Sequence, residues 1–408
     1  MKRSDTQRKR RLWLKWLLAA ASTLAALLGV EAAYRVKLKA TVGDVPLGMS
    51  ATYRAANVAA VKFDADLGYR YRPNTDLVVA RITDGKPVLL FEQPINAEGN
   101  VGPPATDYAA ADLKLMVVGD SFTAIVHDGE AWPDRLAREL EKRRGETVRQ
   151  VNLARDGYGV LQMFDLAAAR VDDLSPDVVM ICFIADDLTR ARVWRGAAVV
   201  DGRQRTWVST TADPDPAPER RVDGELIDAR VSRQWFENWE GKASDPLLAD
   251  LNGEFQRLLA ERATAINFFD ASRSFVYSRL VWGDPFFGMH NTTFNPRIRE
   301  YSYASDDRLP SAISKIRRAG ARLALVQLPQ YEDLLAGRHP LSGQQTALRK
   351  SLEEIAGCPT RELLTFGKPP EPVEELFLLP HDRHPSAEGP DYFAEAAAKM
   401  IESELPAN

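Results

Sequence analysis

The sequence predicts an α/β fold: a three-layer α/β/α domain around a mainly parallel sheet, preceded by one membrane-spanning helix. From residue 113 onwards, short apolar segments alternate with segments of helical periodicity, which is typical of parallel-sheet domains. Some of these apolar segments, such as VVMICFI at 178–184, are continuous, as expected of strands covered by helices on both faces. Near the N-terminus, residues 12–30 form an apolar run of 19 residues whose only charge is Lys15.

The alternating region can be divided into elements by its periodicity and by residues that end helices. Trp132, Leu136 and Leu140 recur at four-residue spacing and predict a helix that ends near Gly145. Gly320 similarly marks the end of a later helix. Along the chain, these criteria predict strands at 113–118, 148–153, 178–184 and 321–329, and further helices at 160–171, 309–319, 343–356 and 387–402.

The N-terminal apolar run predicts a signal-anchor helix. Its length is close to the roughly 20 residues that cross a bilayer, and Lys15 can extend its ammonium to the interface. The basic sequence MKRSDTQRKRR at 1–11 is expected to stay in the cytoplasm, which places residues after about Tyr34 outside the inner membrane, in the periplasm. A signal peptide cleaved near Ala32 is the alternative, and the lack of charge disfavours a buried soluble helix.

The chain is therefore expected to have three parts. Residues 1–34 form the basic tail and the anchor helix. Residues 35–112 contain turn residues and short alternating runs, and predict an extended prelude. Residues 113–408 form the α/β domain, which an insertion at about 188–308 interrupts. The insertion holds 16 of the 35 aromatic residues; these side chains either stack on sugar rings, form the insertion's own core or lie on the membrane surface.

The composition disfavours several classes of protein. The formal net charge is -4 and the one basic cluster lies in the first 15 positions, so nothing indicates nucleic-acid binding. Two cysteines, Cys182 and Cys358, cannot form a disulfide framework, and Cys182 in its apolar run is expected to be buried. The five histidines show no metal-ligand spacing, so neither a metal nor another cofactor is predicted.

The sequence VVGDSFT at 117–123 is the sharpest local indication of chemistry. A buried strand ends there in Gly-Asp-Ser, and open α/β sheets have their sites at the carboxyl ends of strands. Gly119 permits a tight turn that presents Ser121 at this edge, where a following helix can direct N–H groups at a developing negative charge. Because Asp and Ser are also common helix N-caps, a purely structural role is the alternative.

A serine hydroxyl needs a base, and His384 is the best candidate among the histidines. It lies in LLPHDRHPSAEG at 378–389, just before the predicted last helix. Asp382 stands two residues earlier, near enough to fix the imidazole tautomer and to stabilise the charged ring. His127 is too close to Ser121 along the chain, and His290 and His339 lie in irregular segments. A loop position without any chemistry is the alternative for His384.

Two motifs resemble those of the SGNH (GDSL-type) hydrolase family. They are Gly-Asp-Ser-Phe after the first strand and Asp-x-His-Pro-Ser-x-x-Gly before the last helix. The resemblance covers about 113–188 and 309–402, and the prelude is similar to that of membrane-anchored members associated with bacterial surface polysaccharides. It implies that Ser121 is the nucleophile, His384 the base and Asp382 the acid partner. Many members place this acid three residues before the histidine, where this chain has His381.

The resemblance also implies an oxyanion hole that includes Ser121 and the backbone N–H of Gly157, which stands five residues after Asn152. After the third strand the family usually has Gly-x-Asn-Asp, but the run FIADDL puts Asp186 where the asparagine is expected. An ionised carboxylate only accepts hydrogen bonds, and one missing donor costs on the order of 10²–10³ in rate. Asp186 is therefore expected to be protonated, or turned away while another donor serves, or to make turnover slow.

These expectations describe a serine esterase or O-acyltransferase that works through an acyl-enzyme on acyl esters of cell-envelope or exported carbohydrate. The carbohydrate depends on the exported location, the aromatic content and family analogy. Two alternatives stay open: a catalytically weak carbohydrate-binding or assembly protein, favoured by Asp186, and a membrane-surface lipase or thioesterase, favoured by the anchor. The expected partners are an acyl-ester substrate, carbohydrate and the inner membrane, but not nucleic acid.

Overall fold

The computed structural model describes residues 2–42, 52–56, 61–83, 86–200, 203–209, 212, 221–227, 297–298, 300–379 and 382–404. The chain divides into two compact units: one contains the N-terminal helix, and the other contains the α/β domain. Most of the predicted insertion, with Trp235, Trp239 and Trp282, lies outside the described residues, as do His290 and His381.

The predicted apolar N-terminal helix is present as α1 (Lys2–Val42). Its candidate membrane span, Trp13–Ala33, has 21 residues and a mean hydropathy of 1.6. A helix needs about 20 apolar residues to cross a bilayer, so this span is long enough. Ser22 and Thr23 donate their hydroxyl hydrogens to carbonyls one turn earlier, at 2.8 and 2.9 Å, so their polar groups are satisfied within the helix. Its length and composition fit both a membrane anchor and a signal sequence.

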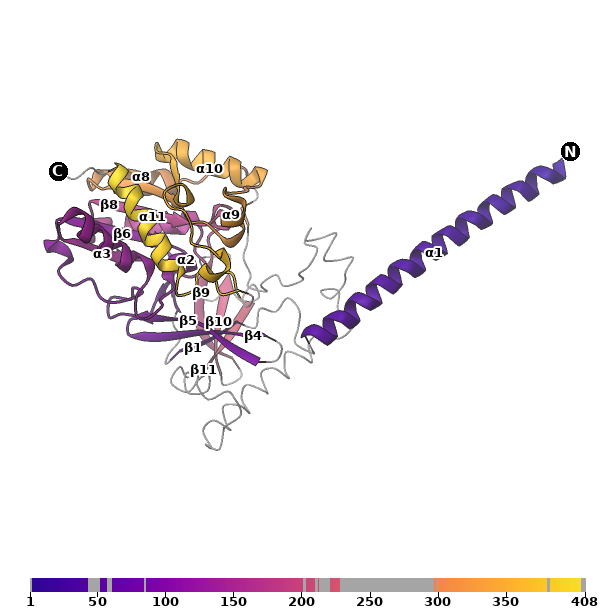
Figure 1. Ribbon diagram of the computed structural model, residues 1–408, viewed down its shortest axis with the longest axis horizontal. Coiled ribbons are helices and arrows are strands. Elements are labelled where there is room, and N and C mark those ends of the chain that lie inside the picture. The colour runs from indigo at the N-terminus through magenta and orange to yellow at the C-terminus, as the bar shows by residue number, and fades with distance from the viewer. Residues whose placement is uncertain are drawn as a thin grey trace, which may run out of the picture. The chain divides into compact units, whose positions relative to one another are not determined.

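A five-stranded parallel sheet forms the centre of the α/β domain and confirms the predicted fold class (Figure 1). Counted along the chain, the strand order is 2-1-3-4-5, so the second strand pairs on one side of the first strand and the third strand on the other. Sheets of this order bind their ligands where the two directions diverge, at the carboxyl ends of the strands. The strands are β6 (Leu113–Gly119), β7 (Val148–Asn152), β8 (Val178–Phe183), β12 (Arg322–Gln327) and β13 (Thr360–Glu362).

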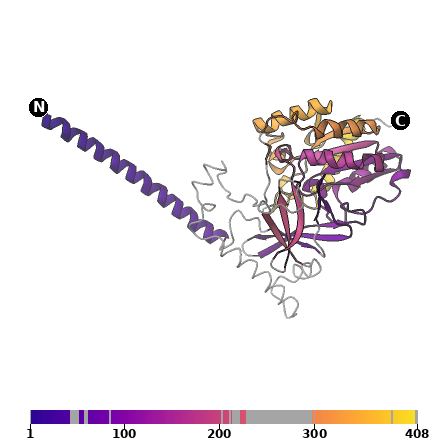
Figure 2. The same ribbon diagram turned by 180° about the vertical axis from the view of Figure 1, so that it is seen from behind.

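Helices cover both faces of this sheet, and the two views show the layers (Figures 1 and 2). Alternate residues of β6 enter different cores: Leu115 and Val117 pack with helices α3 and α11, while Met116 and Val118 pack with α4, α8 and α10. Because both faces are buried, the strand has no polar side, which explains its continuous apolar sequence. The helices are α3 (Trp132–Arg144), α4 (Val160–Leu174), α8 (Arg308–Arg318), α10 (Gly343–Ala356) and α11 (Gly389–Glu404).

The helix ends follow the signals in the sequence. Gly145 ends α3 with a φ of 70°, a left-handed conformation that glycine adopts without strain. At the start of α3, the Asp134 carboxylate accepts the backbone N–H of Ala131 at 2.8 Å. Ser342 caps α10 by accepting the N–H of Gln345, whose side chain in turn accepts the N–H of Ser342.

Strands that lie within residues 35–112 join strands from the insertion in a second sheet. This six-stranded sheet has the order β5-β4-β1-β11-β10-β9, and β1 pairs in parallel with β11. A separate hairpin, β2 with β3, also belongs to the prelude. The bounds are β1 (Thr52–Ala56), β2 (Val61–Asp64), β3 (Gly68–Tyr71), β4 (Thr75–Thr83), β5 (Lys86–Ile95), β9 (Trp194–Val200), β10 (Arg203–Ser209) and β11 (Arg221–Ile227).

The remaining short elements connect the layers. Helix α2 (Ser121–Ala124) follows β6 directly, and α9 (Tyr331–Ala336) follows β12. The 3-10 helices are η1 (Tyr108–Ala110), η2 (Ala185–Thr189), η4 (Leu363–Thr365) and η5 (Val373–Leu376). Cys182, in the middle of the sheet, is buried as the apolar run predicted.

Candidate active site

Ser121 lies at the carboxyl end of β6, beside the point where the strand order diverges. The turn before it needs glycine, because a Cβ on Gly119 would lie 2.5 Å from Thr123 Oγ1 and 2.8 Å from the carbonyl of Cys182. Asp120 then caps α2 by accepting the N–H of Phe122 at 2.9 Å. Ser121 is consequently the first residue of this helix.

His384 reaches Ser121 from a closed loop between η5 and α11. A bridge between Phe377 and Pro385 closes the loop, and the N–H of Leu378 donates to the carbonyl of His384 at 2.9 Å. The imidazole Nε2 lies 2.8 Å from Ser121 Oγ, and Nδ1 contacts the Asp382 carboxylate. The structure therefore places Ser121, His384 and Asp382 in one hydrogen-bonded series.

The geometry allows the neutral imidazole to act as a base for the hydroxyl. With the proton on Nδ1 donated to Asp382, Nε2 is free to accept the hydroxyl hydrogen of Ser121. Burial lowers the pKa of His384, but the charge and hydrogen bond of Asp382, together with the charges of Asp156 and Asp120, outweigh it and hold the pKa above its ordinary value. Raised basicity suits a group that must take a proton from a hydroxyl.

The rings of Phe91 and Phe122 flank the imidazole, with centroids 5.7 and 5.3 Å from its own. Another histidine supports the same loop: Nε2 of His127 contacts the carbonyl of Pro385 at 3.0 Å. The sequence discounted His127 because it is close to Ser121 along the chain. Its contact with Pro385, which is 258 residues away, could not be read from a local pattern.

Two backbone N–H groups are available where the oxyanion hole was expected. The loop after β7 lies against the end of β6, since Arg155 donates its N–H to the carbonyl of Gly119 at 2.9 Å. Within the described part of the chain, neither Ser121 N–H nor Gly157 N–H donates a hydrogen bond. Gly157 has a φ of 85°, in the left-handed region that favours glycine.

The side chain of Asp186 contacts Arg297. Its carboxylate oxygen lies 3.6 Å from Arg297 Nη2, and the two side chains are 48% and 44% exposed. Arg297 also donates to the carbonyl of Asp186 at 2.9 Å and to Thr189 Oγ1 at 2.7 Å. In this arrangement Asp186 acts as an acceptor, so its part in an oxyanion hole stays a prediction.

The residue before Ser121, Asp120, belongs to a buried ionic cluster that the sequence did not predict. Arg190 contacts the carboxylate of Asp187, lies 3.4 Å from that of Asp120 and donates to the carbonyl of Tyr158 at 3.4 Å. Both carboxylates are fully buried, and that of Asp187 also accepts the N–H of Ile184 at 3.0 Å. The arginine thereby joins the end of β6, the loop after β7 and η2. In the sequence, the only local indication of this cluster is the spacing of three residues between Asp187 and Arg190.

The fold and this geometry define an α/β protein with a serine–histidine–aspartate arrangement at the carboxyl edge of its parallel sheet. Residues 115–219 match the family model described as GDSL-like Lipase/Acylhydrolase, which supports assignment to that family. The matched segment contains Ser121, Gly157 and Asp186. No curated protein matches the chain.

Solved structures with similarity to the chain include three crystal structures. The crystal structure of the lipase/acylhydrolase from Enterococcus faecalis has 13% sequence identity and a TM-score of 0.33, over 72% of this chain and 98% of that one. The crystal structure of TesA gives the same identity and score, over 72% and 99%. The lipase Lip_vut3 from a goat rumen metagenome has 12% identity and a TM-score of 0.27, over 70% and 97%. These scores are too low to support conclusions about this chain.

Proposed function

We propose that this protein is a serine esterase or O-acyltransferase in which Ser121 forms an acyl-enzyme. The supporting observation is the contact of His384 Nε2 with Ser121 Oγ at 2.8 Å, with Asp382 on the other ring nitrogen. His384 accepts the hydroxyl proton while Oγ attacks the ester carbonyl. The same proton then goes to the departing alcohol, and the C–O bond of the ester breaks. Water or a sugar hydroxyl next attacks the acyl-enzyme and frees Ser121.

The proposed substrates are acyl esters of cell-envelope or exported carbohydrate. The apolar span Trp13–Ala33 and the basic residues before it support a single-pass location in the inner membrane, with the α/β domain in the periplasm. The aromatic content of the insertion agrees with sugar binding. The domain limits 1–34, 35–112 and 113–408 belong to this proposal.

Two other functions have support from single observations. A catalytically weak carbohydrate-binding or assembly protein is favoured by the carboxylate of Asp186 at a position where a donor is needed. A membrane-surface lipase or thioesterase is favoured by the apolar helix α1. The three functions differ in the length of the acyl group that the substrate carries and in whether the protein turns over an ester.

A panel of esters tests the proposal on the full-length chain in detergent. It includes acetylated sugars, a short phenyl ester, a thioester and a long-chain glyceride. Ser121→Ala and His384→Ala should each lower turnover at least about 10³-fold, because the hydroxyl and its base act as a unit. The matched control is Ser314→Ala, which removes an exposed hydroxyl from helix α8.

The outcomes separate the three functions. Turnover of acetylated sugars that Ser121→Ala abolishes supports the proposal, and a strong preference for the glyceride or the thioester supports the membrane-surface alternative. Absence of turnover on every ester, together with no acyl adduct on Ser121 by mass spectrometry, supports the binding protein.

A further inference from the structure

We infer that Arg195 binds a carboxylate of the substrate beside Ser121, so that esters carrying a carboxylate are preferred. This inference rests on the proposed acyl-transfer function and names its substrate class. Arg195 is the second residue of β9 and is 6% exposed. Within the described part of the chain it forms no hydrogen bond or ion pair, and its Nε is buried without an acceptor.

A buried guanidinium without a counter-ion is costly, because burial removes the water that solvated its charge. The ring of Tyr69, with its centroid 5.2 Å from Arg195 Cζ, offsets only part of this cost. The neighbouring arginines are different. Arg190 contacts two carboxylates, and Arg192 contacts the carboxylates of Asp165 and Asp306. Among the residues that the structure describes, Arg195 therefore lacks the anion that its neighbours have.

Its location indicates where that anion would bind. Nη2 of Arg195 lies 2.9 Å from the point where a Cβ on Gly157 would stand, so the absence of a side chain there admits the guanidinium. The Gly157 N–H is free of acceptors in the described residues. The adjacent Asp156 is close enough for its charge to raise the pKa of His384. The guanidinium thus lies at the edge of the site that holds Ser121.

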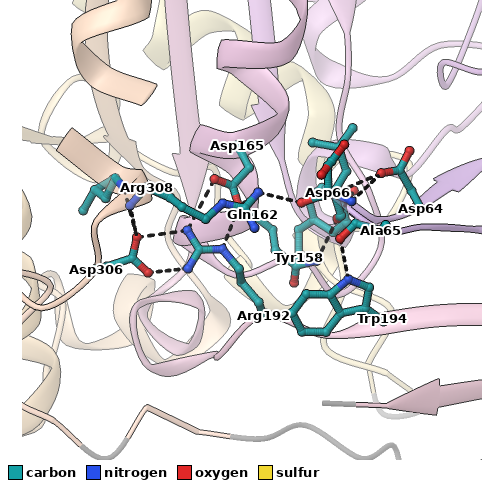
Figure 3. A network of polar contacts seen from close by, with 12 residues as sticks. Asp64, Ala65, Asp66, Tyr158, Gln162, Asp165, Arg192, Trp194, Asp306 and Arg308 are labelled. Atoms are coloured by element: carbon teal, nitrogen blue, oxygen red, sulfur yellow. Dashed lines mark hydrogen bonds and ion pairs between the residues drawn. The ribbon is translucent and has the colours of Figure 1, made fainter. Parts of the chain in front are cut away.

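The segment before Arg195 is fixed on three sides (Figure 3). Arg192 forms ion pairs with Asp165 of α4 and with Asp306. The side chain of Gln162 accepts the backbone N–H of Val193 at 3.1 Å and donates to the carbonyl of Val193 at 2.9 Å. The indole N–H of Trp194 donates to the carbonyl of Ala65 at 2.9 Å. Anchored neighbours reduce the entropy that the arginine loses when it binds a ligand. The guanidinium is consequently presented in one place before substrate arrives.

A carboxylate suits this group better than other anions. The planar guanidinium forms paired hydrogen bonds with a planar carboxylate, and one uncompensated positive charge matches a monoanion. A dianion would carry more negative charge than this single guanidinium neutralises. The substrate therefore carries its carboxylate on the acyl group or on the alcohol, close to the ester.

Two matched pairs of esters test this inference on the full-length protein in detergent. The first pair is 3-carboxyphenyl acetate and phenyl acetate; the second is phenyl hemisuccinate and phenyl butyrate. Arg195→Gln should lower kcat/KM for the carboxylate member of at least one pair by about 10-fold to 100-fold, mainly through KM, because it removes a charge-assisted hydrogen bond. The neutral members should change by less than about threefold. Arg195→Lys should keep part of the preference, and Arg318→Gln, an exposed change on α8, controls for net charge.

The possible results either support the inference or overturn it. An equal fall in kcat for neutral and carboxylate esters would mean that Arg195 acts on the oxyanion or on folding, and overturns it. Equal rates for both members of each pair in the wild type also overturn it. Should Arg195→Gln fail to fold, competitive inhibition of the wild type by benzoate and not by benzamide supports the inference, and equal inhibition by both contradicts it. Full activity of Ser121→Ala on all four esters would instead reject the proposed function itself.

Discussion

Replacing Arg190 by methionine should destabilise the α/β domain because it leaves two carboxylates without their cation. Arg190 is 12% exposed, while the side chains of Asp120 and Asp187 have no exposed surface. Removing one partner from a buried ion pair costs about 3–5 kcal/mol, since the remaining charge has neither water nor a counter-ion. Methionine keeps the length of the side chain, so the loss reports charge and not an empty space.

The pH dependence identifies the cause. Burial raises the pKa of Asp187 and of Asp120, and the Arg190 charge opposes it; without Arg190 both pKa values rise further. Carboxyl groups with raised pKa bind more protons in the folded state, so they destabilise it as the pH rises. The free-energy loss in Arg190→Met should therefore be greatest at neutral pH and should shrink as the pH falls towards about 4, near the ordinary pKa of aspartate.

Thermal unfolding followed by tryptophan fluorescence measures this loss, with Arg297→Met as the matched control. Arg297 forms the same kind of ion pair with Asp186, but both side chains are about half exposed, and such pairs contribute at most about 1 kcal/mol. A Tm of Arg190→Met within a few degrees of the control, or a loss that does not change between pH 4 and pH 7, would refute the reasoning.

Four other predictions concern the site and its location. Asp382→Asn should lower kcat by about 10³–10⁴ and move the acid limb of the pH–rate profile to lower pH, because this carboxylate is the largest influence that raises the pKa of His384; an unmoved limb would contradict the assignment. Asp186→Asn should raise activity by up to about tenfold by supplying a donor, with little effect on Tm; an equal or lower rate at every pH contradicts this. Gly157→Ala should lower kcat more than tenfold by displacing the backbone N–H of residue 157. Gly129→Ala controls for backbone strain, because Gly129 has a φ of 83° and no atom within 4 Å of the added Cβ. Both variants are compared in unfolding and activity measurements. A reporter that works only outside the cytoplasm should be active when fused after residue 40, with the full-length product retained in membranes after a high-salt wash; a shortened soluble product would favour a cleaved signal.

The parallel sheet and its helices could be predicted because their signals are local. The strand at 178–184 is apolar throughout, since helices cover both of its faces, and the observed β8 (Val178–Phe183) differs from the prediction by one residue. Gly145 marked the end of α3 because a left-handed residue there favours glycine. Short elements were missed: β13 has three residues, all partly exposed, and so carries neither a period nor an apolar run.

Contacts between distant segments could not be predicted. The pairing of Arg54 with Leu226 joins the prelude to the insertion, and strand periodicity contains no information about which strand is the partner. The same holds for Arg297 and for Arg195, whose surroundings come from other parts of the chain. At the site, the sequence named Ser121 and His384 from motifs, and the structure brings them together; their catalytic roles stay predictions.

The distance along the chain between Ser121 and His384 has a consequence for biosynthesis. The two residues are 263 positions apart, and the loop that carries the histidine is closed by contacts near Phe377 and Pro385, shortly before the last helix. Since a ribosome makes the N-terminal part first, Ser121 emerges long before His384, its proposed base, has been made. On the proposed mechanism, the hydroxyl therefore remains an ordinary alcohol until the final segment of the polypeptide has docked, and we expect a product truncated before Asp382 to lack esterase activity.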